Sequence, residues 1–103
     1  MYKICFFVPD NAAEFVKIAM FQAGAGKIGN YDCCSFETLG SGQFRALEGA
    51  NPSIGSVGKL EKVVELKIEM VCENAVIKKV VESLKKNHPY EMPAYHIIKL
   101  EEF

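Results

Sequence analysis

Hydrophobic positions recur along the chain with two different periods, and the shorter period, of two residues, predicts strands. Residues 62–72 alternate most cleanly, with apolar side chains on one side and Glu65, Lys67 and Glu69 on the other. This strand should turn one face to the core and the other to water or a polar partner. Tyr2–Val8 carries apolar residues on both faces, which predicts a central strand, and Ala94–Leu100 predicts the last strand.

The longer period predicts two helices. Asn11 and Glu14 have the spacing of a capping box, and an apolar stripe then continues until Gly24 ends the helix. Asn74 is expected to cap a second helix, whose lysine-rich side faces outward. The apolar stripe of this second helix consists of Ala75, Ile77, Val80, Val81 and Leu84.

The segment between the first helix and the alternating strand contains many glycines. Residues 24–30 form a glycine-rich loop, after which Tyr31–Thr38 predicts a strand. The dipeptides Leu39-Gly40 and Ser41-Gly42 permit a tight turn into Gln43–Leu47, which predicts a β-hairpin. Residues 48–58 have no periodicity and form the longest irregular segment, of a kind that often carries function.

These elements predict one α+β domain spanning residues 1–103, with the order β-α-β-β-α-β. Right-handed crossovers place both helices on one face of an antiparallel sheet, which is the ferredoxin-like sandwich. The other face stays bare in a monomer, and positions such as Val63 and Val71 would be exposed there. Because large exposed apolar surfaces usually mark interfaces, we expect an oligomer that covers the open face.

Composition and charge exclude several classes of function. The 103 residues suffice for one modest core, and the net charge of -1 provides no electrostatic footprint for nucleic acid or an anionic membrane. The apolar run at the start stops at Pro9-Asp10, too early for a signal sequence or a membrane span, so we expect a cytoplasmic protein. Cys33 and Cys34 are neighbours on one extended segment and should point to opposite faces, which favours free thiols over a disulfide or zinc site.

Residues 88–95, His-Pro-Tyr-Glu-Met-Pro-Ala-Tyr, are the densest chemical feature of the chain. The two prolines predict a rigid elbow between the second helix and the last strand. His88 and Glu91 could supply two ligands to a divalent metal ion, although a zinc site would need more ligands from a neighbouring subunit. The structural alternative is that His88 caps the helix, Tyr90 packs at the sheet edge and Glu91 bonds backbone or lysine.

The loops offer weaker candidates. Residues 24–30 have GxGxxG spacing, but the loop leaves a helix instead of entering one, so it lacks the helix dipole on which phosphate loops rely. Lys27 could still meet an acidic ligand between subunits. Residues 51–55 form a segment that either contacts a ligand or folds onto its own subunit or a neighbouring one. For Arg45, the only arginine, an ion pair with Glu37 across the hairpin is favoured over catalysis.

No reaction is evident from these residues. An acylphosphatase-type enzyme shares the predicted topology, but it requires an arginine in the loop after the first strand, and residues 8–11 contain none. RNA recognition on the open sheet face would need basic residues around Phe7 and Tyr2. A cysteine nucleophile would need a histidine, and none lies near Cys33 or Cys34 in the sequence. We therefore expect no catalysis.

Several separated motifs resemble one family. They are residues 23–36, Gly42-Gln43-Phe44-Arg45, residues 49–55 and the elbow at 88–95, which occur in the same order in the inserted middle domain of Nif-three-like proteins. These proteins are often labelled dinuclear-metal-centre or type-two GTP cyclohydrolase-like, and the similarity covers nearly the whole chain. The elbow also resembles that of CutA, and the fold implied is that of the CutA and PII-like group.

The resemblance implies a free-standing regulatory or ligand-binding module. CutA and PII-like subunits typically assemble as trimers, so it implies a homotrimer with sites at subunit junctions, where Lys27, Asn30, Asn51, Tyr90 and Glu91 would bind a small molecule or a protein partner. The dinuclear metal site does not carry over, because this chain contains only two histidines, His88 and His96. The alternative is a divalent-metal-binding protein of CutA type that uses His88 and Glu91, and no other cofactor is expected.

Overall fold

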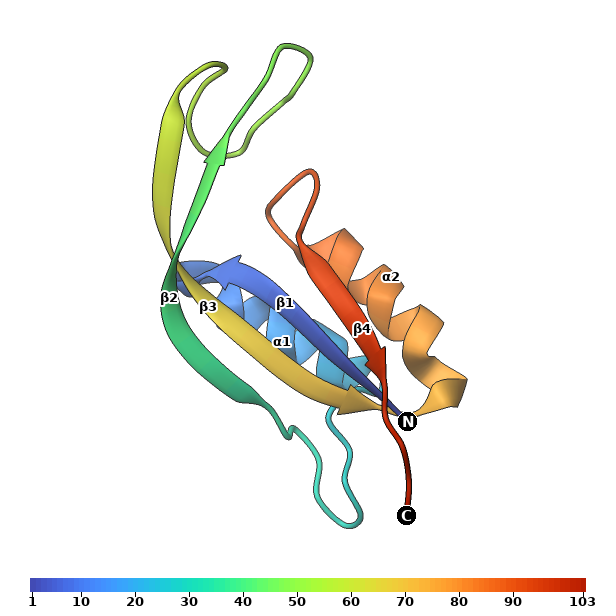
Figure 1. Cartoon of the computed structure of the whole chain (residues 1–103). Helices are drawn as coiled ribbons and strands as arrows, with labels where there is room; N and C mark the ends of the chain where they lie inside the picture. Colours follow the sequence, from blue (N-terminus) through green and yellow to red (C-terminus); the bar gives the residue numbers. More distant parts are fainter.

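The computed structural model describes all residues 1–103 and contains one four-stranded antiparallel sheet. The strand order is β2-β3-β1-β4, so β1 is central as predicted (Figure 1). Each helix follows a short 3-10 turn. In chain order the elements are β1 (Tyr2–Pro9), η1 (Asp10–Ala12), α1 (Ala13–Gln22), β2 (Phe36–Arg45), β3 (Leu60–Cys72), η2 (Asn74–Val76), α2 (Ile77–Asn87) and β4 (Tyr95–Lys99).

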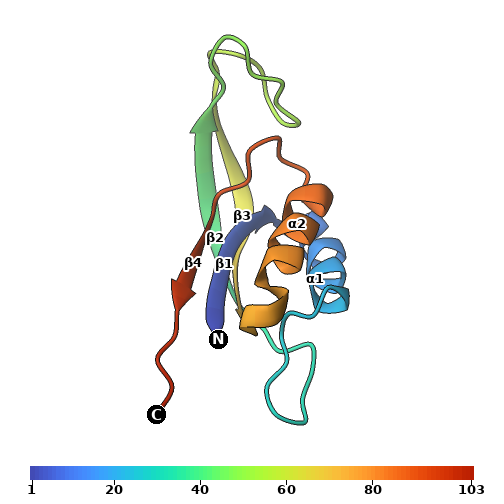
Figure 2. The same cartoon turned by 90° about the vertical axis from the view of Figure 1, so that its right-hand side faces the viewer.

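Both helices pack side by side on one face of the sheet, which confirms the predicted ferredoxin-like arrangement (Figure 2). Neither helix, at 10 and 11 residues, is long enough to cross a membrane. The core lies between the two layers, because the alternation of β1 and β3 sends every second side chain toward the helices. Its fully buried members include Ile4, Phe6, Val8, Val16, Met20, Ile68, Val80 and Leu84.

The predicted hairpin at Leu39–Gly42 is wrong. Strand β2 runs without interruption from Phe36 to Arg45, and all ten of its residues pair with β3, from Phe36 opposite Glu69 to Arg45 opposite Leu60. The hairpin is instead formed by β2 and β3, and residues 46–59 connect them. Glycines permit a turn but do not require one, and here pairing with a 13-residue neighbour keeps the strand extended.

The predicted side-chain caps are also absent. Neither helix has a side-chain hydrogen bond at its N-cap, and the N-cap positions are occupied by Ala12 and Val76. Asn11 and Asn74 lie within the preceding 3-10 turns, one and two residues too early to reach the first free amides of the α-helices. The stripes alone located the helices.

Strands β2 and β3 extend beyond the rest of the sheet. Pairing between β1 and β3 ends at Pro9 opposite Glu65, so residues 40–65 form a projection that we call the arm. The arm lies beyond the layer of helices (Figure 1). Its apolar side chains are therefore largely exposed, among them Leu47, Val57, Leu60 and Val64, and Ala46 is its one buried residue.

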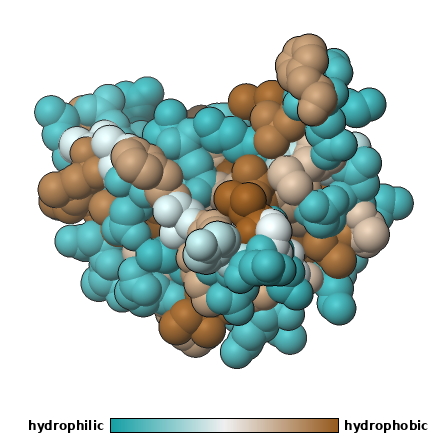
Figure 3. All heavy atoms as spheres, turned by 90° about the horizontal axis from the view of Figure 1, so that it is seen from below, coloured by the Kyte–Doolittle hydropathy of each residue, from teal (hydrophilic) through white to brown (hydrophobic).

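The loop before β2 does not have the extended geometry predicted for Cys33 and Cys34. Cys33 has a φ of 55°, in the left-handed region, and β2 starts only at Phe36. Ile28 and Tyr31 bond to each other across a tight turn with Gly29 at φ 55°. Tyr31 of this loop and Phe36, the first residue of β2, are both exposed. Figure 3 shows the molecule from below, with hydrophobic atoms at the surface among hydrophilic ones. All four cysteines are free thiols.

Candidate functional site

The elbow is fastened to the sheet by the buried side chain of His88. The backbone N–H of His88 bonds the carbonyl of Leu84 at the end of α2, and Pro89 then prevents the helix from continuing. The Nδ1 atom of His88 accepts the N–H of Tyr90 at 3.0 Å, so Nε2 must carry the proton that it donates to the carbonyl of Phe7 at 2.7 Å. Burial lowers the pKa of this neutral imidazole.

Tyr90 connects the elbow to the arm. Its hydroxyl donates a hydrogen bond to Glu65 Oε2 at 2.7 Å, and its ring lies 6.1 Å from the ring of Phe44. Burial, followed by the bond to the Glu65 carboxylate, raises the pKa of Tyr90, so this phenol remains protonated at neutral pH. The contact joins a residue after α2 to a strand 25 positions earlier.

Two glycines on β2 make room beside Glu65. A Cβ atom at Gly42 would overlap the carboxylate of Glu65, so the absence of a side chain there lets Glu65 lie across the strand. At Gly40, which pairs with Glu65, a Cβ would meet nothing closer than a carbonyl oxygen at 3.9 Å. Gly40 therefore opens a hollow in the sheet surface, and Gly42 holds its acidic wall.

The 46–59 loop folds back and contacts the elbow through Glu91. Glu91 Oε1 accepts the backbone N–H of Asn51 at 3.1 Å, a contact between residues 40 positions apart. The loop contains Gly55 at φ 78°, where a Cβ would come within 2.6 Å of the Glu61 side chain. The loop therefore has a defined path and forms a third wall.

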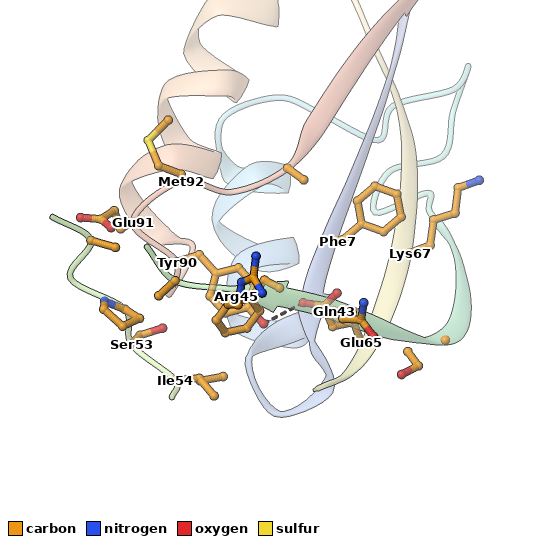
Figure 4. A pocket seen from close by; sticks show the side chains of 18 of the residues that line it. Phe7, Gln43, Arg45, Ser53, Ile54, Glu65, Lys67, Tyr90, Glu91 and Met92 are labelled. Carbon is orange, nitrogen blue, oxygen red and sulfur yellow. Dashed lines mark hydrogen bonds between the residues drawn. The ribbon is translucent and has the colours of Figure 1, made fainter. Parts of the chain in front are cut away.

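These walls border an open cavity of about 750 Å³ between the arm and the elbow (Figure 4). Its floor is the sheet face opposite the helices, because the lining residues Thr38, Gly40, Phe7, Glu65 and Lys67 occupy one face of paired strands. Ten of its 21 lining residues are hydrophobic. This mixture of apolar surface and few polar groups is typical of small-molecule sites.

The predicted ligand-binding residues fall into two separate groups. Asn51 contributes to the loop wall beside the cavity, and Tyr90 and Glu91 line the cavity itself. Lys27 and Asn30 lie in the loop at the opposite end of the chain's fold, both exposed (Figure 1). One subunit does not bring the two groups together, so a shared site would require a second copy.

The structure offers little support for the divalent-metal site predicted at His88 and Glu91. No three His, Cys, Asp or Glu side chains gather at one place, and both ring nitrogens of His88 are engaged within the protein. A metal ion at His88 and Glu91 would have to displace Phe7 or Tyr90 from the imidazole. Metal binding at these two residues stays a prediction, and the structure favours a fastening role for His88.

The predicted ion pair between Arg45 and Glu37 does not form. Glu37 instead receives Lys17 of α1 at 2.8 Å, and Lys17 also contacts Glu14 at 3.0 Å. Arg45 lies in the arm, eight residues along the same strand, and has no acidic partner within the chain. The guanidinium therefore remains free at the wall of the cavity.

The cavity also contains five residues that the sequence patterns do not mark as site residues, namely Phe7, Gly40, Gly42, Phe44 and Glu65. Glycines at alternate positions of a strand can indicate that a ligand or another side chain approaches closely. Gly40 and Gly42 have this spacing, but from the sequence alone they are interpreted as a turn. Glu65 was identified only as part of the polar face of its strand, because its partner Tyr90 is far away in the sequence.

Comparisons with known proteins confirm the resemblance. The chain is 47% identical over 100 residues to a protein of Halalkalibacterium halodurans named GTP cyclohydrolase 1 type 2 homolog, in a match covering 97% of this chain and 27% of that protein. A second such protein, from Bacillus subtilis, is 44% identical over 100 residues, again 97% and 27% of the two chains. The chain thus spans about a quarter of the length of the curated relatives it matches. No protein-family model matches the chain.

Solved structures confirm the fold. A Bacillus cereus protein related to NIF3 superposes with a TM-score of 0.82 at 39% identity, covering 98% of this chain and 26% of that one. CutA1 from Pyrococcus horikoshii superposes with a TM-score of 0.71 over 100% of this chain and 86% of its own. At 18% identity, the second likeness concerns the fold alone.

Proposed function

We propose that this chain is a non-catalytic ligand-binding or regulatory module that acts as a homo-oligomer, with a trimer favoured and with sites near subunit junctions. The observation that carries the proposal is the cavity of about 750 Å³ between the arm and the elbow. Its walls come from three distant parts of the chain and are joined by the Tyr90–Glu65 and Glu91–Asn51 hydrogen bonds. A preformed hollow with such fixed walls suits a small ligand.

The arm supports the proposal of an oligomer. An isolated two-stranded hairpin is marginal in water, and this one exposes Leu60 by 56% and Val64 by 53%. A neighbouring copy that packed against the arm would bury these side chains and hold the cavity's outer wall in place. Apolar surface in such a position is typical of an interface.

The hydrogen bonding of the site supports a non-catalytic role. The candidate acid–base groups already have partners: His88 joins Phe7 and Tyr90, and Tyr90 donates to Glu65. The two buried thiols, Cys5 and Cys72, have pKa values raised chiefly by burial, the reverse of an activated nucleophile. Groups arranged in this way hold the walls of a cavity in position.

The names of the relatives do not extend a cyclohydrolase activity to this segment, because the match covers about a quarter of those proteins. We propose that the module regulates or senses, whatever chemistry the remainder of such proteins performs. A cytoplasmic location belongs to the same proposal, and the four free thiols agree with a reducing compartment.

Binding of a neutral fluorescent probe tests the cavity. N-phenyl-1-naphthylamine should bind the wild-type chain with enhanced fluorescence at the micromolar level, and Gly40→Val should abolish that binding by filling the floor. Because nothing crowds Gly40, the variant should keep its fold and its unfolding midpoint. Lys62→Val, an exposed position of β3 outside the cavity, is the matched control and should bind normally. Equal binding of the probe by the wild type and both variants would contradict the proposal.

Sedimentation velocity tests the assembly. The wild-type chain should sediment as an oligomer at micromolar concentration, with three copies favoured, and Val64→Glu should shift it toward the monomer. Ala75→Glu also places a carboxylate at an exposed apolar position, but next to α2, and should leave the assembly intact. A monomeric wild-type chain at this concentration would contradict the oligomer.

A further inference from the structure

The charges around the cavity are not equally satisfied. Glu65 accepts the hydroxyl of Tyr90, and Glu91 accepts the backbone N–H of Asn51. Arg45, in contrast, lines the cavity with neither an ion pair nor a side-chain hydrogen bond to the rest of the chain. The two cations that line the cavity, Arg45 and Lys67, therefore both lack a partner, and Arg45 is the one that lies at the end formed by the 46–59 loop.

The position of Arg45 is asymmetric within the cavity. It is the last residue of β2, at the end of the cavity formed by the 46–59 loop, whereas Phe7 belongs to β1 at the other end. Figure 4 shows Arg45 rising from β2 on the side of the strand where Phe7 and Met92 lie, while the Lys67 ammonium points away. Glu65 lies between these two ends, beside Gly42.

We propose that the cavity selects a ligand that combines a flat apolar ring with one anionic group, a carboxylate, sulfonate or phosphate, and that Arg45 binds the anion. This inference rests on the proposed function, since it names the ligand class of the same cavity. The ring lies over the floor opened by Gly40, and the anion lies toward the loop end, where the Arg45 side chain can reach it. Glu65 disfavours the reverse orientation, because it would bring two negative charges together.

Guanidinium suits this role for a geometric reason. Its planar array of donors binds the oxygens of carboxylates, sulfonates and phosphates in pairs, and such charge-assisted bonds are roughly twice as strong as neutral ones. At a partly exposed site the gain is limited by solvent and by salt. An increase in affinity of about tenfold over the neutral ligand, which corresponds to about 1.4 kcal/mol, is the size to expect.

Two probes that share a ring system but differ in charge test the inference. 8-Anilinonaphthalene-1-sulfonate should bind the wild-type chain about tenfold more tightly than neutral N-phenyl-1-naphthylamine, and Arg45→Gln should remove that difference while leaving the neutral probe's dissociation constant unchanged. Lys62→Gln, which removes an exposed cation of the neighbouring strand outside the cavity, is the control and should preserve the difference. Raising the salt concentration should weaken only the sulfonate.

The outcomes separate this inference from the proposed function. If the neutral probe binds in a manner abolished by Gly40→Val, but the sulfonate binds no more tightly or Arg45→Gln affects both probes alike, the anion site is wrong and the cavity stands. If neither probe binds, the proposed ligand-binding function fails, and the anion site fails with it.

Discussion

The helix-covered part of the sheet and the arm share strands β2 and β3 but bury their side chains very differently. Under the helices, Ile68 and Met70 of β3 are at most 2% exposed, whereas Leu60 and Val64 on the same strand are more than half exposed. Strand β3 therefore runs from a solvent-exposed region into the buried core. The covered part contains its own core, while the arm depends on the elbow, on its loop and, as we propose, on a neighbouring copy.

The difference indicates where function can be placed. In a packed core, two positions without side chains would leave cavities that lower the stability. At the base of the arm, the missing side chains of Gly40 and Gly42 instead create a hollow that the elbow completes. The covered part supplies the rigid frame. The arm and the elbow, which meet through only a few polar contacts, supply the site.

The largest expected effect comes from the same truncation made in the two regions. Leu84→Ala, in the core, should lower the free energy of unfolding by about 2–5 kcal/mol, through lost burial and the cavity left behind. Leu60→Ala, in the arm, should cost less than about 0.5 kcal/mol in dilute protein. Urea denaturation monitored by circular dichroism measures both.

The cost of Leu60→Ala should grow with protein concentration if a second copy buries the arm. Equal losses for the two variants at every concentration would mean that the arm is as well packed as the core. That result would remove the distinction between the two regions.

Tyr90→Phe should have the next largest effect, because it deletes the bond between elbow and arm. It leaves the Glu65 carboxylate without its donor, and we expect a loss of about 1–3 kcal/mol in unfolding free energy. Hydrogen exchange should accelerate in residues 60–65 and 88–94 and remain unchanged in β1. Tyr31→Phe, at a tyrosine that is 76% exposed, should change neither quantity, and an equal loss there would refute the assignment.

The two β2 glycines should respond differently to alanine. Gly42→Ala should cost about 1 kcal/mol, because the new methyl group displaces the Glu65 carboxylate from Tyr90. Its effect should therefore not add to that of Tyr90→Phe in a double-mutant cycle. Gly40→Ala should be neutral or slightly stabilising, since its Cβ meets open space and reduces the freedom of the unfolded chain. Additive losses would show that Glu65 is not held between the two residues.

The smallest expected effect is a dependence of stability on pH that originates at His88. Burial in the folded state lowers the pKa of this group below its ordinary value of 6.5, so the unfolded chain binds its proton first as the pH falls. Stability from this group is therefore complete above about pH 6.5 and decreases below it. Urea midpoints at pH 7.5 and 5.5 should differ less in His88→Gln than in wild type, and an unchanged difference would exclude His88 as the source.

Local patterns were good guides wherever one face of an element meets the core. The alternation of 62–72 and the stripe through Val80 and Leu84 located β3 and α2, because burial against a layer imposes a fixed period on the sequence. The same reasoning failed at Leu39–Gly42, where β2 borders the arm and no core selects its side chains. There the glycines were mistaken for a turn.

The site was only partly predictable for a related reason. The density of prolines and polar groups at 88–95 identified the elbow, and with it Tyr90 and Glu91. The partners of these residues could not be found from spacing, because the contacts join residues 25, 40 and 81 positions apart. For the same reason the sequence predicts an ion pair between Arg45 and Glu37, whereas in the structure Glu37 pairs with Lys17.

The sequence by itself determined the order of the elements and the face of the sheet that the helices cover, because each of these depends on the period of side chains within a single segment. Only the tertiary structure decided that β2 passes straight through its glycines, that the elbow closes a cavity against the arm, and that Lys27 and Asn30 lie away from it. These features depend on the pairing of distant segments, and no local pattern encodes which of the possible pairings buries the most surface.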